Sequence, residues 1–299
     1  MSVRKAYLQL HVAVVLLAGT AILGDLISLS APVLVWWRTI IASAGIGAFL
    51  VYRGTLRTDW LRQKKKFYVL GAMVALHWIC FFGSIKLANA STALICFATI
   101  TFFTAWIEPW ITGRKREMHE VVFGVMVIPG ILLIAGKAQG DVLIGIIIGI
   151  LAALLVAIIS CYEKKWIHEI DPEHLTLMQM AGAWIALTGW IGGAHALGME
   201  DPFWPTMLDW IYLLILGLIC TSIAWVLAAR AIRVVTAYDS LMVINLEPVY
   251  GILMALILLN DRKELTPTFY IGAAIIMATV LIHPIWQKRH DRKRNPAIR

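Results

Sequence analysis

The chain has 299 residues, of which 60% are hydrophobic and only 15% are charged, and the apolar residues come in blocks of about 20, the length that spans a bilayer as a helix. This composition excludes a soluble globular domain and predicts a polytopic helical membrane protein, since a β-barrel would show short segments of alternating hydrophobicity. The net charge of +8 does not indicate a nucleic-acid partner, because the basic residues lie in the short connections between apolar blocks and at both ends.

Ten apolar segments are predicted to cross the membrane as helices. They lie at residues 6–28, 33–52, 67–87, 91–112, 119–136, 142–162, 174–197, 209–229, 236–259 and 268–286. The apolar run that follows Arg4 and Lys5 continues nearly to Ala31, so a retained first helix is expected rather than a signal peptide. The four cysteines all fall inside apolar segments without paired spacing, and they predict neither a disulfide framework nor a metal site.

The first three segments carry polar residues that are candidates for a site. Asp25, near the outer end of the first segment, could pair with Arg38 as an outer gate or could only stabilise the fold. Arg38 lies about five residues into the second segment and could anchor a substrate carboxylate through its fork of donors, or serve a structural role. His77 in the third segment is either a satisfied core residue or a donor and acceptor for a polar ligand, and Trp78 beside it either stacks on a substrate or packs.

The ninth segment carries Asn245, Glu247 and Pro248 near its middle. A carboxylate at that depth is expensive, so Glu247 should face the bundle interior or a wet cavity. There it could bind a substrate ammonium or exchange a proton in each cycle; the alternative is a kinked, packed helix with Glu247 tied to a neighbour. Asn245 lies about 200° around the helix from Glu247, so both serve one site only if the helix unwinds before Pro248. Trp225 in the eighth segment is also deep enough to line a cavity.

The distribution of Lys and Arg orients the predicted helices. If the N-terminus is cytoplasmic, 21 of these residues fall on the cytoplasmic side and 4 fall outside, namely Lys86, Lys137, Arg262 and Lys263. Positive residues are concentrated in cytoplasmic connections. Both termini are therefore predicted to be cytoplasmic, as an even number of spans requires.

Landmarks in the first half of the chain recur in the second. The Arg-Lys pair at 114–115 recurs 148 residues later at 262–263, and each pair is followed by a glycine nine residues after the lysine, Gly124 and Gly272. A unit of five spans is odd, so its second copy enters the membrane in the opposite direction, as in many transporters. We predict three parts: a first five-helix repeat at 1–141, a second at 142–286 and a basic cytoplasmic tail at 287–299.

The sequence resembles the drug/metabolite transporter superfamily, EamA type. The residues that carry the resemblance are Trp36, Trp37 and Arg38 at the head of the second span, Pro248, Asp261 and Gly272. Asp261 departs from the commoner Glu, and Ile100 stands where a proline would match Pro248, so the two halves need not kink alike. Because the resemblance places an arginine at position 38 across a family with varied substrates, a structural role for Arg38 is favoured.

The resemblance implies a secondary-active transporter of a bacterial inner membrane that exports a small polar or amphipathic metabolite, such as an amino acid. We expect alternating access around a central cavity, with Glu247, Asn245, His77, Trp78, Arg38 and Trp225 binding substrate and with Glu247 and Asp25 as gate or coupling groups. The expected partners are the lipid bilayer, the metabolite and a proton, with the chain a monomer or homodimer.

No enzymatic role is predicted, and with it no catalytic residue, cofactor or metal. A Walker loop, a G-x-S-x-G elbow and the spacing of a zinc-binding helix are all missing from the sequence. Two alternatives stay open: a passive channel or facilitator and, less favoured, an integral-membrane enzyme that modifies lipids.

Overall fold

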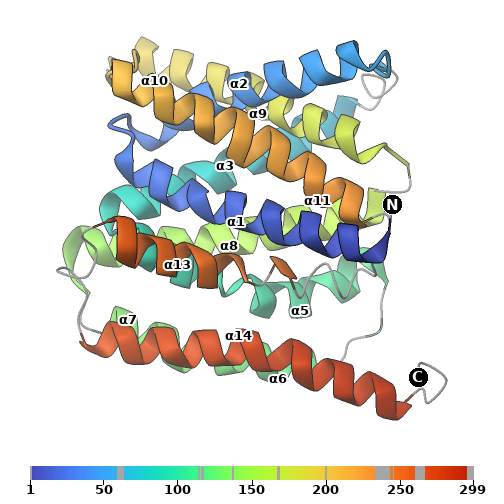
Figure 1. Ribbon diagram of the computed structural model, residues 1–299. Helices are drawn as coiled ribbons and strands as arrows, with labels where there is room; N and C mark the ends of the chain where they lie inside the picture. Colours follow the sequence, from blue (N-terminus) through green and yellow to red (C-terminus); the bar gives the residue numbers. More distant parts are fainter. Residues whose placement is uncertain are drawn as a thin grey trace.

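The computed structural model describes residues 2–58, 64–113, 115, 118–136, 138–166, 169–198, 201–232, 243–244, 246–259 and 267–294. Throughout this part of the chain the regular structure is helical, and the helices run roughly alongside one another (Figure 1). Asn245, Asp261 and the Arg262-Lys263 pair lie outside the described residues.

The helices follow the order of the predicted spans. In chain order they are α1 (Val3–Leu26), α2 (Ala31–Tyr52), α3 (Lys64–Leu87), α4 (Ala90–Phe97), α5 (Ile100–Thr112), α6 (Met118–Met126), α7 (Ile128–Ala135), α8 (Gly140–Trp166), α9 (Pro172–Ala196), α10 (Met207–Leu214), η2 (Ile215–Ile223), α11 (Ala224–Ile232), α13 (Glu247–Leu258) and α14 (Pro267–Arg294). Seven helical stretches of the described residues are long and apolar enough to cross a membrane. Shorter apolar helices lie within the fifth, ninth and tenth predicted spans, so ten spans stay a prediction.

The last helix is longer than the sequence analysis predicts. The tenth span was expected to end at residue 286 and to be followed by a basic tail at 287–299. In the structure α14 continues without a break to Arg294, so residues 287–294 extend the tenth helix.

The fourth span breaks into α4 and α5 at Ala98 and Thr99, although it has no proline there. The break lies 148 residues before Leu246 and Glu247, where α13 begins with Pro248 in its first turn. Tight turn bonds close α4, since the N–H of Ala98 reaches Ile95 O and the N–H of Thr99 reaches Cys96 O. The Thr99 hydroxyl also donates to Cys96 O (2.6 Å). Hydroxyl groups that bond to nearby carbonyls bend helices, which fits a break at this point without a proline.

The middle of the eighth span is a π-helix, η2. Two hydroxyls donate to carbonyls five residues earlier, Thr221 to Leu216 O (2.7 Å) and Ser222 to Gly217 O (2.9 Å), which matches the wider turn. Gly217 allows α2 to approach closely, because a Cβ there would lie 2.6 Å from Ile41 Cγ2. The π-helix is therefore packed directly against the helix that carries Arg38.

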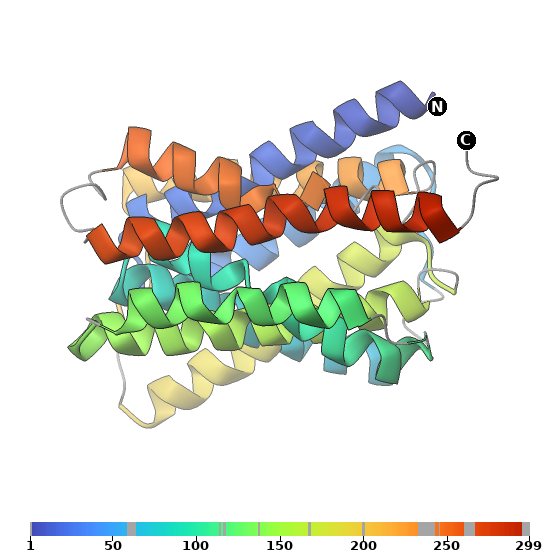
Figure 2. The same cartoon turned by 90° about the horizontal axis from the view of Figure 1, so that it is seen from below.

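Helices of the two predicted halves pair with each other. Helix α2 packs on α9, α4 on α13 and α7 on α14, and α14 lies beside α6 and α7 at one edge of the bundle (Figures 1 and 2). The three pairs join the second predicted span to the seventh, the fourth to the ninth and the fifth to the tenth. In each pair a helix of the first half packs on its counterpart in the second half. This packing is consistent with a repeat, and the opposite orientation of the two halves and the boundary at 141–142 stay predictions.

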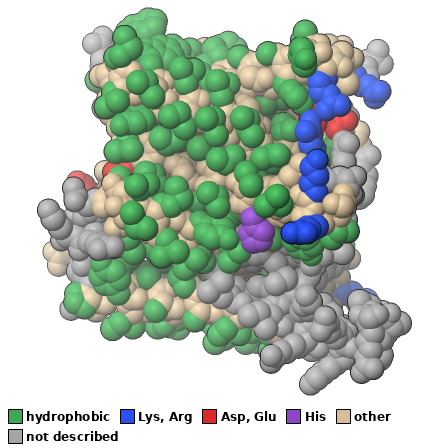
Figure 3. Space-filling model, viewed as in Figure 1, with side chains coloured by type: hydrophobic (Ala, Val, Ile, Leu, Met, Phe, Trp, Pro, Cys, Tyr) green, Lys and Arg blue, Asp and Glu red, His purple; other side chains and the backbone are tan. Residues whose placement is uncertain are grey.

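Charge is distributed unevenly along the bundle. The face shown in Figure 3 is largely hydrophobic, and its Lys and Arg side chains gather near the end that carries the N-terminus. This is the end that the positive-inside rule predicts to be cytoplasmic. We call it the N-terminal end and the opposite one the Lys86 end.

Candidate functional site

Arg38 lies inside the bundle, with 2% of its surface exposed. Its Nε donates to Thr221 Oγ1 of η2 (3.0 Å). The Thr221 hydroxyl has a single proton, which it donates to Leu216 O, so its lone pairs are left to accept from Arg38. The buried Nη1 of Arg38 has no hydrogen-bond partner among the described residues. An unsatisfied buried donor of this kind calls for an explanation, such as a bound water, ion or ligand.

Trp78 of α3 covers the guanidinium group of Arg38. The Cζ atom lies 3.9 Å from the Trp78 ring centroid, and the Phe82 ring is 5.4 Å away on the same helix. A cation over an indole face is stabilised by about 2 kcal/mol or more when it is desolvated. Trp78 thus contacts Arg38 directly, and the pair joins α2 to α3.

Glu247 is the first residue of α13 and is half-buried. Helix α13 packs on α1 and α4, and the charge of Glu247 interacts with that of Arg38 on α2. Among the described residues, no side chain forms a hydrogen bond or ion pair with the carboxylate. The N-terminal end of a helix favours a negative charge, which supports a carboxylate at this position. Glu247 therefore lies close enough to the buried Arg38 for their charges to interact, but the two side chains form no hydrogen bond or ion pair.

His77 joins α3 to α8. Its side chain is 6% exposed, and Nδ1 lies 2.8 Å from the carbonyl oxygen of Ala152, to which it donates. That bond leaves Nε2 as the acceptor of the neutral ring. The ring packs beside Phe81 and Phe97, and its charged form would interact with Arg38. The contact to Ala152 is structural, and Nε2 is the atom left to accept from a ligand.

The remaining candidates are more dispersed. Trp225 of α11 is half-buried, and its Nε1 has no hydrogen-bond partner among the described residues. Asp25 is exposed at the Lys86 end, where its main-chain oxygen accepts from Lys86 Nζ (3.3 Å). The structure does not bring Asp25 to Arg38, which is engaged with Thr221 and Trp78 instead.

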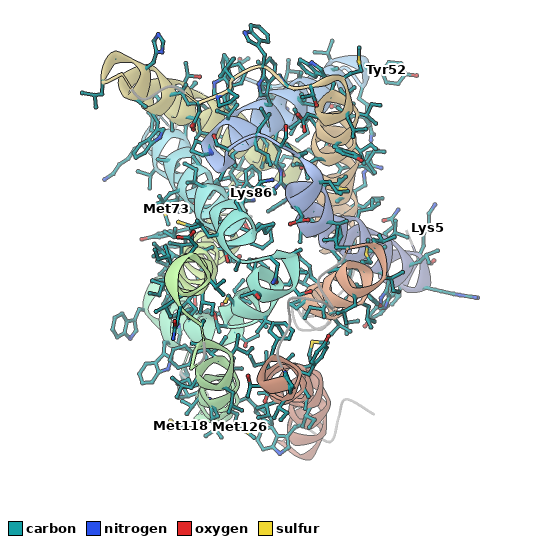
Figure 4. All side chains as sticks on the ribbon, turned by 90° about the vertical axis from the view of Figure 1, so that its left-hand side faces the viewer. Lys5, Tyr52, Met73, Lys86, Met118 and Met126 are labelled. Carbon is teal, nitrogen blue, oxygen red and sulfur yellow. The ribbon has the colours of Figure 1, made fainter. Side chains whose placement is uncertain are left out.

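A contact between the two predicted halves lies at the Lys86 end, the end that faces the viewer in Figure 4, and is not predicted from the sequence. Asp209 Oδ1 accepts from the Ser28 N–H (2.8 Å), and Oδ2 accepts from the Ser28 hydroxyl (2.6 Å). The same carboxylate caps α10 through Thr206, and Lys86 also donates to Ile27 O. The pattern Thr206-x-x-Asp209 before an apolar run is a helix-start signal, but nothing local indicates Ser28 as its partner. This contact joins the two predicted halves.

Comparisons with known proteins address the family and the fold. The family model for the EamA-like transporter family matches residues 4–136 and 143–283. A solved crystal structure is similar with a TM-score of 0.65 and 17% sequence identity, covering 96% of this chain and 99% of that chain. At this identity the likeness shows the fold alone. A search among curated proteins gave no match.

Proposed function

The chain belongs to the EamA-like transporter family, and on this premise we propose that it is a secondary-active exporter of a small zwitterionic metabolite such as an amino acid. Membership makes it a membrane transporter of the drug/metabolite type. The substrate, the direction and alternating access between two inverted halves of a ten-span bundle are part of the proposal, as are a bacterial inner membrane and cytoplasmic termini.

The observation that carries the proposal is the pair of opposite charges on Arg38 and Glu247. The two charges interact, yet Arg38 Nη1 has no partner and the carboxylate accepts no hydrogen bond among the described residues. Charges in a membrane interior are rare and mark substrate or ion pathways. A carboxylate and an ammonium on one small molecule would match these charges in sign, and Trp78 would supply apolar surface beside them.

Glu247 has two possible roles in such a cycle. It binds the substrate ammonium directly, or it takes up a proton on one side of the membrane and releases it on the other. Because Gln keeps the shape of Glu but neither titrates nor carries charge, Glu247→Gln separates them. If Glu247 is the coupling group, the dependence of transport on a pH gradient should disappear. If it is the ammonium anchor, KM should increase by about tenfold or more, because a charge-assisted hydrogen bond to the substrate is lost.

The test uses the purified chain in proteoliposomes. Proteinogenic amino acids are first screened for a rise in the apparent melting temperature, because a ligand that binds the folded state stabilises it. Labelled counterflow of a stabilising amino acid is then measured. Saturable counterflow supports a carrier, whereas electrogenic flux without saturation identifies a channel and contradicts the proposal. If Glu247→Gln keeps the wild-type rate, KM and pH dependence, Glu247 is neither anchor nor coupling group.

A further inference from the structure

A polar groove opens at the N-terminal end of the bundle, apart from the site around Arg38. It has a volume of about 390 Å³ and lies between the segment that follows α2, the start of α9 and the end of α11. Arg53, at its edge, is 15 residues beyond Arg38, which is roughly 22 Å along a helix. The groove is therefore separate from the proposed transport site.

Cationic side chains dominate the groove. Arg53, Arg57 and Arg230 all line it. Two carboxylates line it too, but Glu173 pairs with Arg230 (3.5 Å) and Asp171 takes part in an interaction of its own. Three arginines and two carboxylates leave the groove with a net positive charge, and neither Arg53 nor Arg57 has an ion-pair partner among the described residues.

Two of the cations share one aromatic ring. Arg53 Cζ lies 5.7 Å and Arg230 Cζ 5.5 Å from the centroid of Phe49, a residue of α2. Attraction to the ring gathers two like charges at the rim of the groove. Glu173 compensates Arg230, so an anion beside Arg53 would relieve the repulsion that remains.

A hydrogen bond across the predicted halves holds the Arg57 segment in place. His174, near the start of α9, is 5% exposed, and its Nε2 accepts from the Arg57 main-chain N–H (3.0 Å). Gly54, with φ of 62°, turns the chain back after α2 so that this contact can form. This hydrogen bond thus holds in place the segment that carries Arg57, one of the arginines that line the groove.

Apolar side chains continue from the groove to the bundle surface. Leu56 lines the groove and is 42% exposed, and Val51 and Tyr52 are exposed on the preceding turn of α2. A ligand with both an anionic group and hydrocarbon fits this surface better than a free anion does.

We propose that this groove binds the phosphate group of an anionic lipid, held by the guanidinium forks of Arg53 and Arg57 beside the Thr55 hydroxyl. Guanidinium groups bind phosphate with paired hydrogen bonds, and basic recesses between helices at the cytoplasmic surface suit lipid headgroups. The acyl chains lie over the exposed apolar side chains of α2. The lipid would stabilise the contact between α2 and the start of α9.

The experiment measures thermal unfolding of the full chain in dodecyl maltoside micelles. Dioleoylphosphatidylglycerol, dioleoylphosphatidylcholine or inorganic phosphate is added to wild type, to Arg53→Gln/Arg57→Gln and to Arg4→Gln/Lys5→Gln. The last variant is the matched control, because it removes the same two charges at the same end from exposed positions outside the groove. We expect phosphatidylglycerol at about a hundredfold excess over its Kd to raise the melting temperature by about 5 °C in wild type and control. The groove variant should lose that rise.

The other additions identify the source of the phosphate. Phosphatidylcholine, which has no net charge, should give a smaller rise. If inorganic phosphate alone reproduces the rise and the groove variant abolishes it, a phosphate site is supported but the lipid is excluded as its required source. A full rise in the groove variant, or an equal loss in the control, overturns the proposal. Native mass spectrometry is a second measurement that does not depend on basal stability: phosphatidylglycerol should stay on wild type and control, and equal retention by the groove variant contradicts the site.

Discussion

The surroundings of Arg38 must offset the free-energy cost of burying its charge. It is a buried cation whose Nε has one acceptor, Thr221, and whose face is covered by Trp78. A guanidinium group is costly to bury without acceptors, and no acceptor of the described residues reaches Nη1. The Thr221 and Trp78 contacts of Arg38 are structural, and the unpartnered Nη1 is the donor that the proposed function assigns to a ligand.

Replacement of Thr221 tests how much its hydroxyl contributes to the stability of the protein and to the position of Arg38. Thr221→Val keeps the shape but leaves Arg38 Nε without its acceptor, which should destabilise the protein by about 1–3 kcal/mol. The melting temperature should fall by several degrees, and substrate KM should rise if Arg38 is displaced. Thr221→Ser keeps the hydroxyl and serves as the control. Equal melting temperatures and KM values for the two variants would show that the hydrogen bond has no role.

The π-helix η2 and the break between α4 and α5 are two irregular elements that adjoin the proposed site, whereas the break at Val127 between α6 and α7 lies at one edge of the bundle. Helix η2 supplies Thr221 to Arg38, and α4 packs on α13, which begins at Glu247. Irregular turns inside membrane helices are tolerated where protein buries them, and π turns often occur at functional sites. These elements lie beside the proposed site between α2, η2 and α13.

The close packing of η2 on α2 can be tested through its glycine. Gly217→Ala places a methyl group 2.6 Å from Ile41 Cγ2 and 2.9 Å from Ile41 Cβ, so the helices must separate. Overpacking of this kind typically costs about 1–3 kcal/mol. Gly47→Ala on α2 is the control, because nothing lies within 4 Å of its new methyl group. Circular dichroism melts should show a clear loss of stability for Gly217→Ala alone; similar melts for both would contradict the packing described here.

The two predicted halves are tied at both ends of the bundle. At the Lys86 end Asp209 binds Ser28, and at the N-terminal end Lys66 pairs with Glu169 and the Arg57 N–H binds His174. Alternating access requires the halves to separate at one end while they stay joined at the other. These contacts are therefore the ones that we expect to break and reform during transport.

Loss of one bond at the Lys86 end should favour opening there. Ser28→Ala removes the hydroxyl bond to Asp209 and leaves the cap of α10 intact. A hydrogen bond to a charged group contributes about 1.5–3 kcal/mol, so the ratio of open to closed molecules should rise by about tenfold or more. Spin labels at the exposed positions Leu26 and Leu208 should report a longer distance population. Ser43→Ala removes a hydroxyl bond within α2 and should leave the distance unchanged; no change in Ser28→Ala would argue against this contact as a gate.

Much of this protein follows from its amino-acid sequence because membrane insertion depends on local composition. Twenty apolar residues predict a span wherever they occur, and the residues around Trp36 and Pro248 carry a resemblance that the family match confirms. The sequence also marks Glu247, since a carboxylate in an apolar segment is conspicuous without any knowledge of its neighbours.

The partners of these residues depend on packing between segments far apart in the chain. Arg38 and Thr221 are 183 residues apart, and Ser28 and Asp209 are 181 apart. Neither the π-helix nor the break in the fourth span contains a proline that would predict it, and in both a hydroxyl donates to a main-chain carbonyl. Hydropathy identifies which segments enter the membrane, but it is uniform along their apolar faces and so contains no information on which faces meet. Only the folded arrangement, with its close helix contacts and its hydrogen bonds between distant segments, selects them.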